Sequence, residues 1–335
     1  MLKDCFYYGT YSPCGFYTLL SNSDFCRCDK ILLHGNSDGV KQQLLDCVKS
    51  KLNCVEIMRD DKKIGVFCKD KNILVADDCF ADFENCRRFA LSNFQCGDLL
   101  EKNRCKTDKI IAEKNKAFAK CQRFLSACNE ICTDAVRIDS ESIDRSKLNR
   151  YTANLWKKYG STPKGRIGRQ STALVSCITA DGCEINYGAF NSYCKKIVAV
   201  CDKTGACSHL IAERIRRYAL GAGYDVINCV CPMNPKRTEH VIIPELKFAV
   251  FSSEYYHRAD FDNCRKSFAA KFHTPESEKT KQRVNFTLKA YHSLMCEVFD
   301  SIKQINACDR KLDCIFMPAT DIRQAEKELL LEICG

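Results

Sequence analysis

The second half of the 335-residue chain repeats the order of apolar and polar segments of the first half, at an offset of roughly 165 to 175 residues. Each half opens with a short alternating segment that predicts a strand, a turn and a strand, at residues 7–15 and 175–182. Each then has an apolar run, at residues 31–33 and 197–200, preceded by lysine and followed by a polar loop. Such runs predict strands buried in a parallel sheet, and a repeat this long indicates a duplicated domain.

A helix is predicted after each of these loops, because apolar residues recur at helical spacing. These residues are Leu44, Leu45, Val48 and Leu52 in the first half and Leu210, Ile211, Ile215 and Ala219 in the second. Apolar runs ending in polar residues follow at 73–78 and 248–253, and long helical stretches near 108–158 and 278–332 close the halves. We therefore predict an α/β fold of two tandem domains, each a mostly parallel sheet flanked by helices.

Residues 159–170 concentrate glycine, proline and cations, which is the composition of a domain linker. The predicted boundaries are a first domain at 1–160, a basic linker at 161–170 and a second domain at 171–335. The formal net charge of +10 is concentrated around this linker, where no acidic residue occurs before Asp181. Its cations are Arg145, Lys147, Arg150, Lys157, Lys158, Lys164, Arg166 and Arg169. A solvated linker is favoured over nucleic-acid binding, since no nucleic-acid motif or set of stacking aromatics accompanies the cations.

The composition excludes several other classes of protein. No run approaches the roughly 18 to 20 apolar residues that span a bilayer, and the start of the chain does not resemble a signal peptide, so we expect a cytoplasmic protein without membrane partners. The 26 cysteines are scattered without a framework spacing, which predicts reduced thiols that are mostly small buried residues. The tightest pairs, Cys26 with Cys28 and Cys229 with Cys231, lack the C-x-x-C spacing of a zinc site.

The loop after the first predicted strand partly matches the phosphate-binding pattern G-x-x-x-x-G-K-[ST]. In that pattern the lysine reaches the β and γ phosphates and the hydroxyl binds magnesium. Gly35 and Lys41 stand at the matching positions, but Val40 replaces the second glycine and Gln42 the hydroxyl. The candidate nucleotide-binding residues are Gly35, Asn36, Ser37, Asp38, Gly39, Val40, Lys41, Gln42 and Asp77. A structural turn remains the alternative for the loop itself.

The corresponding loop of the second half departs further from the pattern. Its candidate residues are Thr204, Gly205, Ala206, Cys207 and Ser208. Ser208 fills the hydroxyl position, but Cys207 replaces the lysine and Cys201 the first glycine, so no cation would meet a γ phosphate. Residues 165–172 imitate such a loop only superficially, because no apolar strand precedes them.

An aspartate at the end of a neighbouring strand would hold magnesium through its water shell. Asp77 or Asp78 has this position in the first half, and Asp77 is the candidate magnesium ligand, with a turn after a strand as the alternative role. The second half offers Ser252 and Ser253 instead. The first half thus keeps a lysine and an acid, and the second keeps neither.

The segment 240–246, His-Val-Ile-Ile-Pro-Glu-Leu, with the strand after it and His257 beyond, resembles a family of bacterial tandem P-loop ATPase-like proteins without a settled cellular role. Residues 223–226 and 229–232 also match, and the resemblance extends over nearly the whole chain. The resemblance implies a P-loop NTPase-like fold in each half and nucleotide binding. It also implies lysine at position 207 and aspartate at position 252, where Cys207 and Ser252 stand.

These observations predict a P-loop NTPase-related protein that binds ATP with magnesium in its first half, with hydrolysis weak or absent. We assign no catalytic residue. His240 and His257 are candidates for lining the site, with a structural hydrogen-bonding role as the alternative. A non-catalytic scaffold that keeps only the fold is the competing hypothesis, and nucleic-acid binding through the basic segment is a weaker one. The sequence identifies no protein partner.

Overall fold

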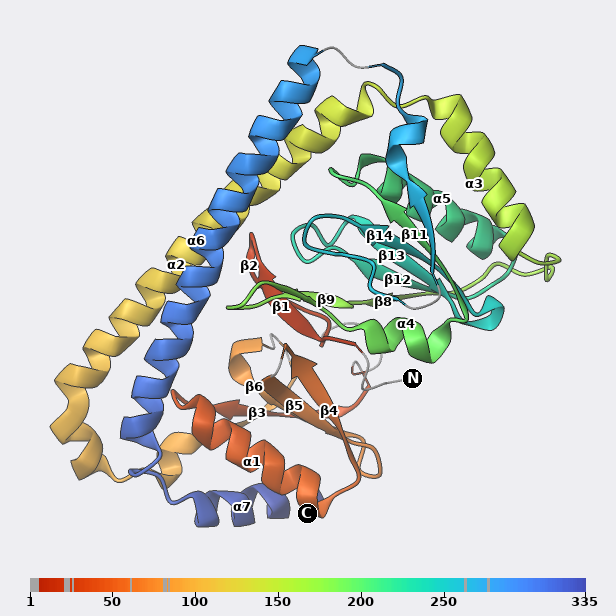
Figure 1. Ribbon diagram of the computed structural model, residues 1–335. Helices are drawn as coiled ribbons and strands as arrows, with labels where there is room; N and C mark the ends of the chain where they lie inside the picture. The colour runs from red at the N-terminus through yellow and green to blue at the C-terminus, as the bar shows by residue number, and fades with distance from the viewer. Residues whose placement is uncertain are drawn as a thin grey trace. The chain divides into compact units, whose positions relative to one another are not determined.

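A computed structural model of the protein (Figure 1) describes residues 6–20, 25, 27–60, 62–80, 83, 85–261, 264–275 and 278–335. The chain forms two compact units. Unit 1 comprises Met1–Thr10, Gly15–Gln122 and Val298–Gly335, and unit 2 comprises Tyr11–Cys14 and Arg123–Glu297. Both units therefore contain segments from both halves of the sequence.

The sheet of unit 1 has five strands in the order β4-β5-β6-β3-β7. The strands are β3 (Asp29–His34), β4 (Cys54–Arg59), β5 (Lys62–Cys68), β6 (Ile73–Asp77) and β7 (Arg87–Ala90). Strand β3 lies between β6 and β7 and is parallel to both, whereas β5 is antiparallel to its neighbours β4 and β6. Two 3-10 turns, η1 (Asp78–Phe80) and η2 (Leu91–Phe94), follow β6 and β7.

The sheet of unit 2 has six strands in the order β15-β11-β14-β13-β12-β8. They are β8 (Gln170–Ala173), β11 (Lys196–Cys201), β12 (Val226–Val230), β13 (Thr238–Ile243), β14 (Phe248–Ser253) and β15 (Cys264–Phe268). Here β11 is parallel to β14 and β15, and β13 is antiparallel to its neighbours β12 and β14. The shorter strands β1 (Gly9–Ser12) with β2 (Gly15–Thr18) and β9 (Ser176–Ile178) with β10 (Cys183–Ile185) form two-stranded pairs at the predicted strand-turn-strand segments.

The two large sheets share one topology, in which β4-β5-β6-β3-β7 corresponds to β12-β13-β14-β11-β15. The predicted α/β architecture with two sheets and flanking helices is confirmed. Both sheets are mixed, because β5 and β13 run antiparallel to their neighbours while the remaining strands of each sheet run in one direction. Short hairpins join the antiparallel strands, with Asn72 (φ 54°) and Lys247 (φ 48°) in the left-handed region. A parallel connection needs a crossover of a dozen or more residues, which these turns are too short to provide.

Each sheet is covered by a helix from its own half and by one from the other half. In unit 1, α1 (Asp38–Lys51) packs beside α7 (Ile322–Cys334), as Figure 1 shows. In unit 2, α5 (Ala206–Gly221) packs beside α3 (Arg145–Tyr159). The long helices α2 (Gly97–Ser140) and α6 (Glu278–Phe316) contribute residues to both units. A short helix, α4 (Tyr187–Tyr193), and the turns η3 (Pro244–Leu246) and η4 (Ala269–Phe272) complete unit 2. Packing thus groups the chain differently from the predicted boundaries at 160 and 171.

Two helices, α7 in unit 1 and α3 in unit 2, come from the other half of the sequence, and we call them the exchanged helices. Equivalent backbone hydrogen bonds precede them in both units. The N–H of Asp321 donates to the carbonyl of Phe94 in unit 1, and that of Asp144 donates to the carbonyl of Phe272 in unit 2. Each aspartate then caps the helix that follows it, through Gln324 N–H in α7 and Lys147 N–H in α3. The repeat detected in the sequence therefore extends to equivalent hydrogen bonds.

The cysteines that the structure describes are free thiols, some buried and some exposed, such as Cys105 and Cys296. Cys26 lies outside the described residues. None of the helices in the described ranges combines the length and the hydropathy needed to cross a bilayer.

The core of unit 1 depends on α7, the last helix of the chain. Leu329 is fully buried in the cluster formed by α1 and the sheet, while Leu331 on the same helix is 61% exposed. We expect Leu329→Ala to lower the free energy of unfolding by about 2 to 5 kcal/mol, and Leu331→Ala to change it by less than about 0.5 kcal/mol. Urea denaturation of the full-length variants measures both. Equal effects would contradict the packing of α7 on unit 1.

Candidate functional site

The loop between β3 and α1, where the sequence predicted a nucleotide site, is filled by the chain itself. Ser37 caps α1 by accepting a hydrogen bond from Val40 N–H at 3.2 Å, and its own hydroxyl donates to Asp313 Oδ1 at 2.8 Å. The N–H of Gly39 also donates to Asp313 Oδ1, at 2.9 Å. The carboxylate of Asp313, near the end of α6, therefore accepts the donors that a phosphate would use.

Lys41 is committed to two carboxylates. Its side chain is 1% exposed, and Nζ lies 2.7 Å from Asp77 Oδ1 and 2.9 Å from Asp78 Oδ1. Burial would lower the pKa of Lys41, but Asp77, Cys79 and Asp78 together raise it above its ordinary value, so the ammonium stays charged. The structure thus brings Lys41 and Asp77 together as the sequence suggested. Asp77, Asp78 and Cys79 could together hold a metal ion, but the ammonium lies where a cation would bind.

The other first-half candidates have packing roles. A side chain at Gly35 would meet Leu91 at 2.9 Å, and one at Gly39 would meet Met317 Sδ at 2.7 Å. Val40 is fully buried in the core. Asp38 lies 3.5 Å from Lys62, Asn36 is exposed, and Gln42 donates to the carbonyl of Lys63 on β5. These contacts give the loop no converging set of donors for a phosphate.

The loop between β11 and α5 is closed in a similar way. The carboxylate of Asp202 accepts the N–H groups of Cys207 at 2.7 Å and Ser208 at 3.0 Å. Thr204 Oγ1 accepts from Ala206 N–H and donates to Asp139 Oδ2 at 2.5 Å. The start of α5 is therefore satisfied by residues of this chain.

Asp139 near the end of α2 and Asp313 near the end of α6 have equivalent roles, since each accepts the hydroxyl of the loop in its unit. Cys207, at the lysine position, is buried, and burial raises the pKa of its thiol. Its Sγ lies 3.4 Å from His273 Nε2. The side chain at this position is therefore a buried thiol and not a cation.

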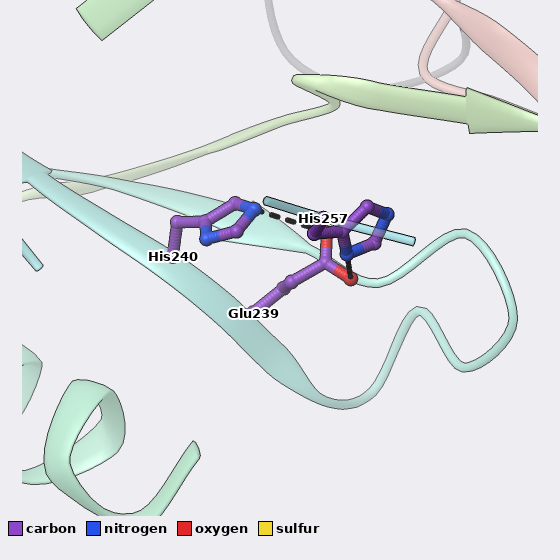
Figure 2. Close-up of side chains that lie close together, drawn as sticks. All are labelled: Glu239, His240 and His257. Atoms are coloured by element: carbon purple, nitrogen blue, oxygen red, sulfur yellow. Dashed lines mark ion pairs between the residues drawn. The ribbon is translucent and has the colours of Figure 1, made fainter. Parts of the chain in front are cut away.

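The two candidate histidines lie together with Glu239 inside unit 2 (Figure 2). A β-bulge explains the arrangement, because Cys229 pairs with His240 and Val230 with Thr238, which leaves Glu239 as the extra residue. A bulge re-aims a side chain, so consecutive residues can reach the same place. His257 comes from the loop after β14.

Glu239 accepts a hydrogen bond from Ser176 and lies beside one nitrogen of each histidine. Ser252 N–H donates to His240 Nδ1 at 3.0 Å, so a neutral His240 carries its proton on Nε2, which lies 3.4 Å from Glu239 Oε2. Ser176 Oγ donates to the same oxygen at 2.7 Å, and His257 Nδ1 lies 3.1 Å from Oε1. A protonated Nε2 has no lone pair for a metal. Although these three residues are close enough to hold an ion, their hydrogen bonds disfavour it.

These contacts set the charges of the cluster. Burial would raise the pKa of Glu239, but His257 and His240 hold it well below its ordinary value. Burial likewise would lower the pKa of His257, but Glu239 and Glu254 raise it. Burial lowers the pKa of His240, in accord with a neutral ring. Glu239 and His257 therefore form a buried ion pair, with neutral His240 stacked on Phe251 at 4.3 Å between ring centroids.

A cavity of about 50 Å³ adjoins this cluster. His257 and Arg237 both line it, and each presents a buried nitrogen without a hydrogen-bond partner among the described residues, Nε2 in His257 and Nη2 in Arg237. Arg237 Nε donates to His209 Nδ1, and His209 Nε2 lies 3.1 Å from Glu254 Oε1. Gly205 is at φ 83°, and a side chain there would meet Glu254 and Arg237, so this network packs directly against the second loop.

A larger cavity of about 1100 Å³ lies at the carboxyl ends of β11, β14 and β15. Three lysines line it, Lys203 after β11 and Lys281 and Lys289 on α6. Tyr255 and Phe268 also line it, with 57% and 62% of their surfaces exposed.

The sequence did not single out these lining residues. The available signals were the position of Lys203 directly after an apolar run and the helical spacing of Lys281, Asn285, Lys289 and His292. A cation on a predicted helix usually faces solvent, so this spacing alone does not indicate a site.

No protein-family model, curated protein sequence or solved structure matches this chain. The resemblance to tandem P-loop ATPase-like proteins therefore rests on the motif residues alone.

The buried pair of Lys41 and Asp77 predicts a stability effect that needs no ligand. We expect Lys41→Met to lower the free energy of unfolding by about 3 to 5 kcal/mol, because it leaves a buried carboxylate without its partner. The double variant Lys41→Met/Asp77→Leu also removes the more buried of the two carboxylates, so it should lose less than the single variant. Urea denaturation without nucleotide measures the three proteins, and an unchanged single variant would contradict the role given to Lys41.

Proposed function

We propose that this protein binds a nucleotide in the large cavity of unit 2 and does not hydrolyse it. The main support is that Lys203, Lys281 and Lys289 line this cavity and form no ion pair with another described residue. Unpaired cations around a concave site attract an anionic ligand.

Three carboxylates also line the cavity, and each already accepts hydrogen bonds from the chain itself. Asp202 accepts two backbone N–H groups of α5. Asp139 accepts the hydroxyl of Thr204, and Glu254 accepts that of Ser252 at 3.0 Å and lies beside His209. The three lysines keep free N–H groups, which favours phosphate over a cationic ligand.

The exposed rings of Tyr255 and Phe268 offer surfaces on which a base could stack. Each lines the cavity with more than half of its surface exposed, and the Tyr255 ring lies 3.8 Å from that of His292 between centroids. Stacking a base on an aromatic side chain contributes about 1 to 3 kcal/mol and tolerates any base. A ligand with both a planar ring and phosphates fits this combination.

The place of the cavity in the sheet agrees with the proposal. Ligands of open α/β sheets bind outside the carboxyl ends of the strands, and this cavity lies at the ends of three parallel strands.

Phosphoryl transfer draws no support from the same residues. Cys207 provides no cation, and Ser252 Oγ at the acid position lies 2.5 Å from Ser208 Oγ and 3.0 Å from Glu254 Oε1. Neither is a carboxylate that could hold magnesium. We therefore propose binding without hydrolysis, as in a pseudo-ATPase.

The other hypotheses have weaker support. ATP in the first half would require Lys41 to leave two carboxylates and a phosphate to displace Asp313. In the basic segment, Arg166 pairs with Asp225 at 2.9 Å and Lys164 pairs with Glu245, so part of its charge is already neutralised. A scaffold without ligand is the result expected if no nucleotide binds.

Titration calorimetry with AMP, ADP and ATP, with and without magnesium, tests the proposal. We expect the wild-type protein to bind, and Lys203→Gln/Lys289→Gln to weaken affinity at least about tenfold, or about 1.4 kcal/mol, because two phosphate-contacting cations are lost. The control Lys195→Gln/Lys279→Gln removes the same charge from two exposed lysines outside the cavity and should bind as wild type.

Three outcomes would overturn this proposal. One is no heat with any nucleotide at millimolar concentration, and another is an equal loss in the control. A loss caused by Lys41→Gln but not by the cavity variant would place the site in the first half.

A further inference from the structure

Arg237 is a buried cation with unused donors. It precedes β13, and its Nε donates to His209. Nη1 has only a 4.0 Å contact with Cys132 Sγ, and Nη2 is buried without a partner among the described residues. A guanidinium has five N–H donors and stays charged at any physiological pH, so donors left unmet inside a protein cost free energy.

His257 presents a second unused nitrogen to the same region. Its Nδ1 is held by Glu239, and Nε2 lies on the far side of the ring from that contact, as Figure 2 shows. The residue is only 7% exposed, and Nε2 has no partner within the described ranges. Because Ser176 and His240 hold Glu239 in place, the direction of the His257 ring is fixed.

Both residues line the cavity of about 50 Å³. A cavity needs roughly 10 to 15 Å³ to hold one water molecule, so this one has room for a group of several heavy atoms. Of the neighbouring carboxylates, Glu239 accepts from Ser176 and lies beside His240 and His257. Glu254 lies beside Ser252 and His209, and its charge raises the pKa of Arg237. The unmet groups are therefore donors, and the missing partner is an acceptor with several oxygens.

The small cavity adjoins the large one, since five residues line both: Lys203, Glu254, Tyr255, Leu288 and His292. A ligand with its ring against Tyr255 could extend a phosphate past Lys203 into the small cavity. The planar fork of an arginine suits two phosphate oxygens at once.

We propose that Arg237 Nη2 and His257 Nε2 form an oxyanion site that binds a phosphate group of the ligand. The proposal rests on the proposed function for the ring-binding part of that ligand. The phosphate site itself can be tested without a nucleotide.

Inorganic phosphate is the first probe. Its binding to the full-length chain is measured by ³¹P NMR and by calorimetry. We expect saturable binding by the wild type, and at least about tenfold weaker binding by Arg237→Lys, which keeps the charge but loses the fork. His257→Gln should also weaken binding severalfold. Arg265→Gln, an exposed residue of β15 that lines neither cavity, is the control and should bind as wild type. Circular dichroism checks the folding of each variant, and if Arg237→Lys fails to fold, His257→Gln decides.

A comparison of AMP with adenosine then locates the phosphate of a nucleotide. The wild type should prefer AMP, and Arg237→Lys and His257→Gln should reduce this preference while binding adenosine as the wild type does. Wild-type phosphate and AMP binding in both variants would overturn this inference, even if the cavity lysines still matter. The absence of phosphate binding by the wild type would also overturn it. If phosphate binds in an Arg237-dependent way but no nucleotide binds, the oxyanion site is supported and the proposed function is contradicted.

Discussion

In both units a carboxylate of the chain occupies the start of the helix that follows the central parallel strand. Asp313 serves α1 through Gly39 N–H and the Ser37 hydroxyl, and Asp202 serves α5 through the N–H groups of Cys207 and Ser208. A helix start has free N–H groups and the positive end of the dipole, so it must find an acceptor. Because this chain supplies the acceptor, these helix starts do not need a bound phosphate to satisfy their N–H groups.

Because the chain's own carboxylates occupy the two phosphate-loop positions, the groups that could bind an anion lie elsewhere. Lys41 is held by Asp77 and Asp78, whereas the lysines of the large cavity have no carboxylate partner in the described structure. Arg237 and His257 add unused donors nearby. The cavity lysines are exposed to solvent, whereas buried donors without a partner need an explanation, for which we propose a ligand. The proposed site therefore lies beside the second phosphate-loop position and not within it.

The exchange of helices ties the two halves into one structure. The core of unit 1 includes Leu329 and Ile333 from the end of the chain, and that of unit 2 includes Leu148 and Leu155 from the first half. Neither half of the sequence contains all of the apolar residues of one core. Equivalent caps, Asp144 and Asp321, start the exchanged helices, so the exchange follows the same geometry in both units.

Local patterns in the sequence determined the strands β3 and β11, the helices α1 and α5 and their repetition, because periodicity and loop composition act over a few residues. They also singled out Lys41 and Asp77, which the structure joins in a buried ion pair. Only the tertiary structure decided that Asp313 fills the first loop, that α3 and α7 are exchanged, and that Arg237 and His257 line one cavity. Those contacts join residues far apart in the chain, and their geometry follows from packing, which no local pattern encodes.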